Sequence, residues 1–201
     1  MWPSSRRVGA RSNRRRLRYV ELAVRADQES AYQAFFARHH TDLARLAYLI
    51  TGDPNAAADI AADALVEIWR HWRRVRSADN PLGYARGVLA NTARGWLRRE
   101  RRERLGLLRS RLSTDKYRGP DVPAVLDVRA ALRRLPIRRR ECVVLRYAFD
   151  VPEKEVAAIL GISVGAVKSH TSRGADQLAT LLRKAGTVDD DLGLLPVLER
   201  R

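Results

Sequence analysis

The stretch EKEVAAILGISVGAVKSHTSR, residues 153–173, decides the fold of the C-terminal part of the chain. Its pattern predicts a short helix, a tight turn and a longer second helix. Ala157 is small where two crossing helices must approach closely, and Gly161 can take the positive φ that such a turn requires. Ser163 is placed to cap the second helix. Together these offsets predict a helix-turn-helix.

The second helix of this motif has an outward face that suits the major groove of DNA. Lys168 and Arg173 are expected to contact phosphates, because a positively charged side chain binds the DNA backbone whatever the base sequence. Ser169 or Ser172 can reach a base edge. A helical hairpin with a solvated charged face is the alternative, but the turn chemistry favours DNA binding. The predicted DNA contacts are Ser163, Val164, Gly165, Ala166, Lys168, Ser169, Ser172 and Arg173.

The whole chain is strongly basic. Of 201 residues, 39 are Lys or Arg and 23 are Asp or Glu, so the formal net charge is +16. This charge fits a nucleic-acid partner, although a membrane surface would also attract it and a GC-rich genome also favours Arg. The single cysteine, Cys142, excludes an intramolecular disulfide and a cysteine-based metal cluster. No apolar run approaches the ~20 residues of a membrane span and no signal peptide is recognisable, so a cytoplasmic location is expected.

Three helices are expected in an N-terminal block, residues 28–104. Apolar residues recur at spacings of three and four along residues 35–50. The sequence Gly-Asp-Pro at 52–54 closes this helix and starts a second one over residues 55–72. After a loop, a third helix begins near Pro81. The tryptophans predicted to lie in the core are Trp69, Trp72 and Trp96.

Four further segments complete the predicted organisation. Residues 1–27 form a basic extension, expected to be disordered when free or to precede a true translation start near Val24. Residues 105–124 form a linker rich in polar residues and proline, and a second helical block spans 125–185. The tail, 186–201, is acidic and then apolar. The predicted fold class is all-α, with two small helical domains joined by a flexible linker.

An acidic stripe interrupts the basic character of the N-terminal block. Asp59, Asp63 and Glu67 follow one another at intervals of four residues, so they share one face of the second helix. In so basic a chain an acidic stripe is a poor surface for DNA and a sensible one for a basic protein partner. Solvated charges on a free helix face are the alternative.

Taken together, the segments resemble bacterial sigma factors of the extracytoplasmic-function group of the sigma-70 superfamily, and in particular short actinobacterial SigE-like members. The resemblance covers about residues 28–104 and 125–184. Each segment alone is a weak signal, but their order and spacing are specific. Those that carry the resemblance, besides the helix-turn-helix, are Tyr48–Asp53, Ala57–Leu65, Asn80–Asn91, Ala131–Pro136 and Arg140–Tyr147.

This resemblance implies a sigma factor that binds core RNA polymerase and directs promoter-specific initiation of transcription. Region 2 of the family docks on the β′ clamp helices of the polymerase and melts and reads the −10 element, while region 4 reads the −35 element and holds the β flap. The implied partners are promoter DNA, core polymerase and, as for many relatives, an anti-sigma factor. No cofactor, metal, membrane or small-molecule substrate is implied. The apolar tail is one candidate for an anti-sigma contact.

The resemblance also implies which residues carry these roles. Asp59, Asp63 and Glu67 would contact the polymerase clamp. Opened −10 DNA needs stacking platforms, a pocket for an extruded base and phosphate contacts, which the loop at 75–81 and the following helix can supply. The candidates there are Asn80, Tyr84, Arg86, Asn91, Arg94, Arg98 and Arg99.

The chain departs from the family pattern at three points. Ala62-Asp63 stands where Gln-Glu is usual, which retains the acidic character and loses an amide. Ala166 stands where Thr is usual and His170 where Arg is usual, so each removes a polar contact to DNA. No −35 consensus can therefore be transferred to this chain.

Two other classes of protein share part of this pattern or charge. Residues 167–170, Val-Lys-Ser-His, resemble the recognition helix of LuxR-type regulators, which do not bind core polymerase as a sigma factor does. The acidic stripe and the Arg-rich third helix argue against such a regulator. An enzyme is not expected, because the four histidines form no Glu-x-x-His or His-x-x-x-His pair and no phosphate-binding glycine loop occurs.

Overall fold

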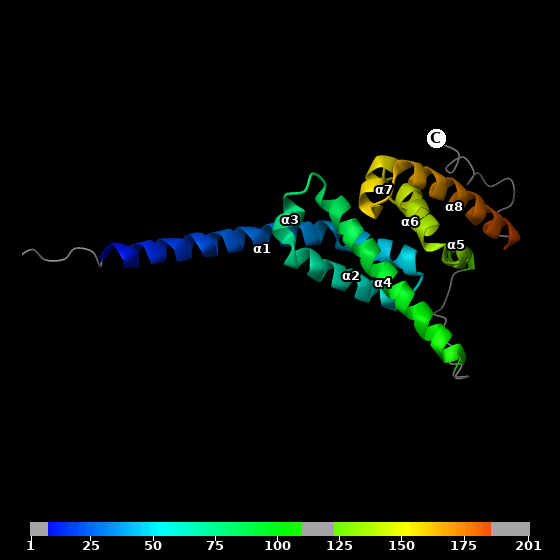
Figure 1. Ribbon diagram of the computed structural model, residues 1–201, viewed down its shortest axis with the longest axis horizontal. Coiled ribbons are helices and arrows are strands. Elements are labelled where there is room, and N and C mark those ends of the chain that lie inside the picture. The colour runs from blue at the N-terminus through cyan, green and yellow to red at the C-terminus, as the bar shows by residue number, and fades with distance from the viewer. Residues whose placement is uncertain (1–7, 110–122, 186–201) are drawn as a thin grey trace, which may run out of the picture.

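The computed structural model describes residues 8–109 and 123–185, and every regular element in these two ranges is a helix (Figure 1). The predicted all-α class is confirmed. The elements are α1 (Val8–Thr51), α2 (Pro54–Arg70), α3 (Trp72–Arg76), α4 (Pro81–Arg109), α5 (Pro123–Arg134), α6 (Ile137–Val143), a short π-helical segment η1 (Val144–Ala148), α7 (Glu153–Leu160) and α8 (Val164–Lys184).

The corner between α1 and α2 forms as its sequence predicts. Gly52 takes a φ of 72°, a left-handed conformation that a residue with a Cβ adopts only at a cost. The Asp53 side chain accepts hydrogen bonds from the backbone N–H groups of Asn55 and Ala56, and Pro54 occupies the first turn of α2. These three residues therefore end one helix and cap the next.

The first three long helices pack around an aliphatic core. Leu46, Ile60 and Leu89, from α1, α2 and α4, are almost completely buried. Trp72 is buried and Trp96 packs against the core, as predicted. The prediction for Trp69 is wrong, because 43% of this residue is exposed. Its ring lies on the Tyr32 ring, with centroids 4.8 Å apart, at the margin of the core rather than inside it.

The helix-turn-helix is present in α7 and α8. Gly161 ends α7 in the left-handed conformation, with φ of 64°. The Ser163 hydroxyl accepts a hydrogen bond from the Ala166 N–H at 3.1 Å and so caps α8. Val167 is fully buried and Ala157 nearly so, which lets α7 and α8 cross closely.

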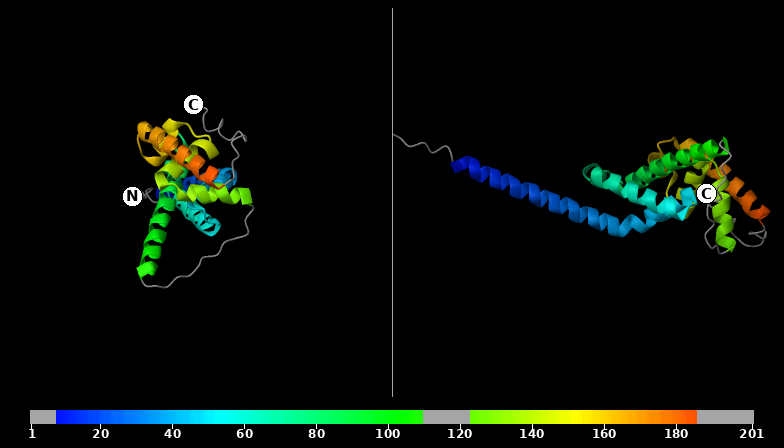
Figure 2. Two further views of the ribbon diagram at one scale, coloured as in Figure 1. Left: turned by 90° about the vertical axis from the view of Figure 1, so that its right-hand side faces the viewer. Right: turned by 90° about the horizontal axis from the view of Figure 1, so that it is seen from below.

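The two helical blocks do not stand apart in this structure. Buried residues from both belong to one continuous hydrophobic cluster. The α4 helix lies against α7, and the C-terminal part of α1 lies against α5 (Figures 1 and 2). The α5 side chain Arg129 also donates a hydrogen bond to the Tyr48 hydroxyl of α1. A closed arrangement of the two blocks is therefore built from specific contacts.

Residues 8–27, predicted to belong to a disordered extension, lie instead in α1, which is continuous from Val8. Its first half projects away from the packed body of the molecule (Figures 1 and 2). The physical reason is that the packed residues further along α1 already supply the helix nucleus, so each added residue contributes a hydrogen bond without a new nucleation cost. Residues 1–7 and the tail at 186–201 lie outside the described residues.

The linker is described only at its two ends. The α4 helix continues to Arg109, five residues into the range 105–124 predicted as linker, and α5 begins at Pro123. Residues 110–122 lie outside the described part of the chain. The domain boundaries themselves therefore stay predictions.

Candidate nucleic-acid interface

The α8 helix presents most of its predicted DNA contacts to solvent. Ser163, Gly165, Lys168, Ser172 and Arg173 are exposed, whereas Val164, Ala166 and Ser169 are half-buried on the flanks of the same face. The side chain of Lys168 lies 3.9 Å from the Glu153 carboxylate of α7. An exposed ion pair of this length contributes little, so the ammonium can exchange this partner for a phosphate.

The acidic stripe on α2 lies at the surface, but its members differ. Asp59 and Asp63 are exposed. Glu67 is half-buried and lies 3.5 Å from Arg70 and 3.0 Å from the His71 ring on its own helix. The two aspartates are therefore the better candidates for a basic partner, because Glu67 already has local partners.

Sequence reasoning missed the apolar side chains beside this stripe. Val66 and Trp69 are 49% and 43% exposed, and Phe36 of α1 is 40% exposed. Val66 follows Asp63 by three residues and Trp69 follows Val66 by three, so these side chains are neighbours on the helix surface. Spacing puts these residues on the helix surface, but a helical period alone does not show which apolar side chains the neighbouring helices leave exposed. Aromatic side chains are enriched at protein interfaces, so an exposed tryptophan beside the acidic stripe marks this face as a candidate interface.

The loop before α4 and the first turn of that helix are held by Asn80. Its side-chain oxygen accepts a hydrogen bond from the Gly83 N–H at 2.7 Å, and its amide nitrogen donates to Glu155 of α7 at 2.8 Å. Tyr84 is half-buried, with the Arg74 guanidinium 5.9 Å from its ring centre. Asn80 is therefore both a helix cap and a link between the two helical blocks.

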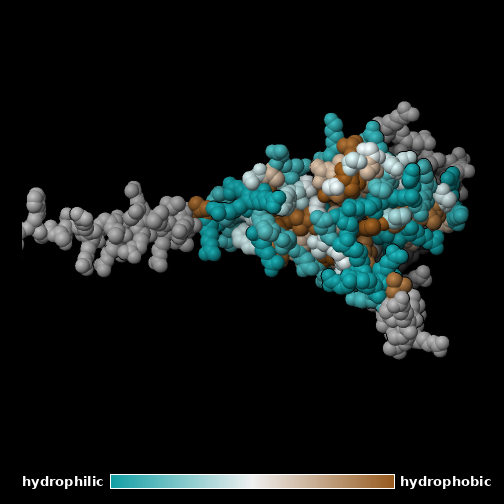
Figure 3. Space-filling view, in the orientation of Figure 1, coloured by the Kyte–Doolittle hydropathy of each residue, from teal (hydrophilic) through white to brown (hydrophobic). Residues whose placement is uncertain are grey.

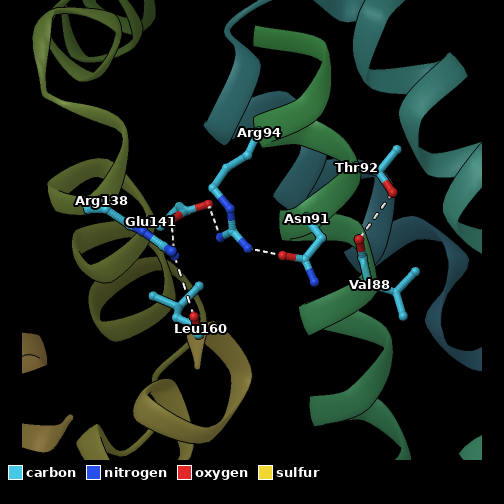
Figure 4. Close-up of polar contacts among 7 residues, drawn as sticks. All are labelled: Val88, Asn91, Thr92, Arg94, Arg138, Glu141 and Leu160. Carbon is cyan, nitrogen blue, oxygen red and sulfur yellow. Dashed lines mark hydrogen bonds and ion pairs between the residues drawn. The ribbon is translucent and has the colours of Figure 1, made fainter. Parts of the chain in front are cut away.

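Two predicted −10 contacts point into the interface between the blocks rather than into solvent. The side chain of Arg86 is 11% exposed and lies 3.7 Å from the Glu155 carboxylate. The side chain of Arg94 is 12% exposed and donates to Glu141 of α6 at 2.7 Å (Figure 4). Figure 4 also shows the second guanidinium nitrogen of Arg94 on the side-chain oxygen of Asn91.

Glu141 is the buried centre of this contact. Its side chain is 0% exposed, and its second oxygen accepts from Arg138 at 3.3 Å (Figure 4). Arg138 in turn reaches the Leu160 carbonyl at the end of α7. Burial raises the pKa of Glu141, and the charges of Arg94 and Arg138 oppose that rise. A buried carboxylate held by two guanidinium groups from two domains is a specific contact.

Arg140 makes a second buried link. Its guanidinium donates to the Ile50 carbonyl at the end of α1 and to the Arg133 and Leu135 carbonyls, the latter two at 2.6 and 3.1 Å. A cation at the C-terminus of α1 is also favoured by the helix dipole. Burial lowers the pKa of Arg140 to about 10, and the charge of Arg133 adds to the effect.

A cleft of about 410 Å³ lies between α4 and α7. Asn80, Tyr84 and Asn91, three predicted −10 contacts, line one side, and Glu155 and Ile159 of α7 line the other. The remaining members, Arg98 and Arg99, are exposed further along α4. The structure therefore places Asn80, Tyr84 and Asn91 along the cleft with α7, and Arg86 and Arg94 against acidic residues of the other block. Arg98 and Arg99 stay outside these contacts with the other block's carboxylates.

The described residues include no group of three or more His, Cys, Asp or Glu side chains that could hold a metal ion. Among the described helices, none is both long enough and apolar enough to cross a membrane. Hydrophilic residues cover most of the face shown in Figure 3. The chemistry of these surfaces is that of charged and aromatic contact groups.

Comparison with known families gives two matches. The family Sigma-70 region 2 matches residues 35–103, and the family Sigma-70, region 4 matches residues 126–178. The first match covers α2, α3 and most of α4, and the second covers the helix-turn-helix.

Individual relatives agree with these matches. The RNA polymerase sigma-E factor of Streptomyces antibioticus is 30% identical over 151 residues, which are 74% of this chain and 81% of that protein. The ECF RNA polymerase sigma factor SigM of Mycobacterium tuberculosis is 29% identical over 178 residues, 87% of this chain and 88% of the relative.

A solved structure supports the fold. It is the sigma factor RpoE of Bartonella quintana, determined in complex with the anti-sigma factor NepR. It matches with a TM-score of 0.63 and 22% identity, and covers 76% of this chain and 97% of the other. The chain therefore belongs to the sigma-70 family, within its extracytoplasmic-function group, and is a sigma factor that binds core RNA polymerase and directs the initiation of transcription.

Proposed function

We propose that this sigma factor uses three separate surfaces. The exposed face of α8 reads the −35 element, the N-terminal half of α4 with its preceding loop reads opened −10 DNA, and the acidic and apolar face of α2 docks on the β′ clamp helices. The observation that carries the proposal is the side-by-side exposure of Asp63, Val66 and Trp69 in a chain of net charge +16. A surface of that kind suits a basic protein partner and repels DNA.

The −10 surface has to be uncovered before it can bind DNA. Asn80, Arg86 and Arg94 are engaged by Glu155 and Glu141 of the other block in the closed arrangement. We propose that docking on polymerase separates α4 from α7. Binding energy at the clamp and flap would then offset the loss of these interdomain contacts.

The clamp surface is tested by docking on core polymerase. We expect Asp63→Arg to weaken binding to core polymerase about tenfold or more, because it places like charges together at the interface. The matched control is Glu103→Arg, an exposed residue of α4 outside the surface. Fluorescence anisotropy against core polymerase measures both. Equal binding by the two variants would remove α2 from the interface.

The recognition face is tested by salt dependence. We expect Lys168→Ala to lower the slope of log binding constant against log salt by about one, since one phosphate contact is lost. Lys184→Ala is the control, because Lys184 is exposed at the far end of the same helix. An effect confined to one base position, or an equal effect of both variants, would contradict the phosphate role.

Further partners and location belong to the same proposal. The Bartonella relative was solved with an anti-sigma factor, and we propose that a protein of this kind also binds this chain. We also propose that the chain works in the cytoplasm, beside RNA polymerase, and catalyses no reaction by itself. Run-off transcription with core polymerase and the chain's own upstream region is the overall test. Transcription that does not depend on the protein would overturn it.

A further inference from the structure

A second cleft, of about 560 Å³, lies between α4 and the α5–α6 region and is strongly basic. Seven arginines line it, four from α4 and three from the α5–α6 region. Leu97, Leu135 and Ile137 supply apolar wall. The cleft exists only because the two blocks are packed together, since each block contributes about half of the charge.

Few carboxylates balance these arginines. Glu100 pairs with Arg104 at 2.5 Å, and Glu141 is shared by Arg94 and Arg138. Among the residues that the structure describes, Arg98, Arg101 and Arg133 have no carboxylate partner. Like charges gathered in one concave site repel one another unless an anion lies between them.

Arg140 adds an independent sign of a missing anion. It is 6% exposed, and its guanidinium contacts only carbonyl oxygens. Its Nε has no hydrogen-bond partner in the described part of the chain. A buried cation that is hydrogen-bonded only to carbonyl oxygens is costly. Its pKa is lowered by burial to about 10, although the charge of Glu141 opposes that fall. An anion in the cleft would relieve this cost.

We propose that this cleft binds a compact chain of linked phosphates, either inorganic triphosphate or the triphosphate group of a nucleotide. Guanidinium groups match phosphate oxygens in bidentate pairs, and several arginines converging from two walls suit several linked phosphates. A volume of about 560 Å³ lies in the ordinary range for small-molecule sites and is far too small for duplex DNA. The bound phosphates bridge α4 and α6, so the ligand stabilises the closed arrangement.

The proposal goes beyond the proposed function, because it needs neither polymerase nor promoter. It is tested on the full chain by calorimetric titration with inorganic triphosphate at constant ionic strength. We expect Arg133→Gln and Arg101→Gln each to weaken binding about tenfold, the effect of losing one charge-assisted contact. Neither residue belongs to the three surfaces of the proposed function.

Two matched controls separate a built site from general attraction to a basic protein. Arg134→Gln and Arg102→Gln change the net charge equally, lie next to the test residues, and do not line the cleft. Both should bind triphosphate like the parent chain. Equal losses of triphosphate affinity in the test and control variants would overturn the proposal. A loss of affinity in only one of Arg101→Gln and Arg133→Gln would also overturn it, because the ligand has to contact both walls.

Two further titrations identify the source of the phosphates. If adenosine or guanosine triphosphate binds more tightly than inorganic triphosphate, the apolar wall contacts the nucleotide base. Equal affinity would mean that the site recognises the phosphates alone. A synthetic peptide of residues 187–198, which is acidic and then apolar, supplies the competing class. Binding of that peptide without binding of any triphosphate would show a peptide-docking site and sink the proposal.

Discussion

The proposed recognition helix α8 and the proposed −10 surface of α4 carry similar polar side chains but differ in how far these are exposed to solvent. The α8 face is largely exposed, and the ion pair between its Lys168 and Glu153 of α7 is long. On α4, by contrast, Arg86 and Arg94 are nearly buried against acidic residues of the other block. The proposed −35 surface is therefore open in the closed molecule, while the proposed −10 surface is covered. Under the proposed function, region 4 meets DNA without rearrangement, whereas region 2 requires the blocks to separate.

The largest expected effect comes from removing the buried centre of the contact. Glu141→Ala leaves Arg94 and Arg138 without their carboxylate, and we expect a loss of about 3–5 kcal/mol in the free energy of unfolding. Glu103→Ala, at an exposed site, should change it by less than about 0.5 kcal/mol. Urea denaturation measures both. Similar values for the two variants would mean that the α4–α6 contact is no stronger than a surface pair.

The next effect tests whether region 4 depends on its local turn. Gly161→Ala places a Cβ at a φ of 64°, which should cost about 1–2 kcal/mol although no other atom lies within 4 Å. Gly95 lies inside α4 with equally open surroundings, so Gly95→Ala should stabilise the protein by up to about 1 kcal/mol. Thermal unfolding followed by circular dichroism compares them. The two substitutions should change the free energy of unfolding in opposite directions. Changes in the same direction would contradict the role of the turn.

A smaller effect would sharpen the contrast between covered and open surfaces. Glu155→Gln removes the charge that faces Asn80 and Arg86, and should raise affinity for single-stranded −10 DNA about two- to fivefold, as expected for a partly exposed pair. Affinity for duplex −35 DNA should not change, because α8 is already free. Anisotropy titrations with both DNAs provide the measurement. A rise for both DNAs would point to a general change in charge rather than to opening.

The smallest effect is a pH dependence of stability. Burial raises the folded-state pKa of Glu141, so the folded protein binds a proton at this residue more tightly than the unfolded chain does. This difference stabilises the fold at low pH, and the stabilisation is lost as pH rises through the raised pKa. Relative to Glu141→Gln, the parent chain should therefore lose stability with rising pH above the ordinary pKa of a glutamate. Denaturation series between about pH 4 and pH 7 test this. A parallel pair of curves would show that Glu141 does not titrate in this window.

Local features of the fold were predictable because neighbouring residues decide them. Gly52 and Gly161 take the left-handed conformation, and Asp53 and Ser163 cap the helices that follow, as their sequence offsets predicted. The helical period also predicted that most of the α8 face would be exposed. Trp69 was misplaced because a period locates a residue on a stripe but does not say how far the partner helix extends over it.

The sequence predicted which residues belong to the candidate sites better than it predicted what surrounds them. The residues on α4 could be named, but nothing in their spacing indicates that Glu141 and Glu155, roughly fifty and seventy residues away, would face them. The arginine-lined cleft was likewise invisible, because its two walls come from separate blocks. Long-range pairs of this kind depend on how two packed surfaces meet, which no local pattern encodes.

The sequence by itself determined the main helices from residue 28 onward, the caps at Asp53 and Ser163, the helix-turn-helix and the membership of the sigma-70 family. Each of these follows from local spacing or from the order of segments. Only the tertiary structure decided that α4 lies against α7, that Glu141 is buried between arginines, and that seven arginines share one cleft. The physical reason is that helix formation is governed by interactions within a few residues, whereas burial and ion pairing between blocks depend on complementary surfaces brought together by folding.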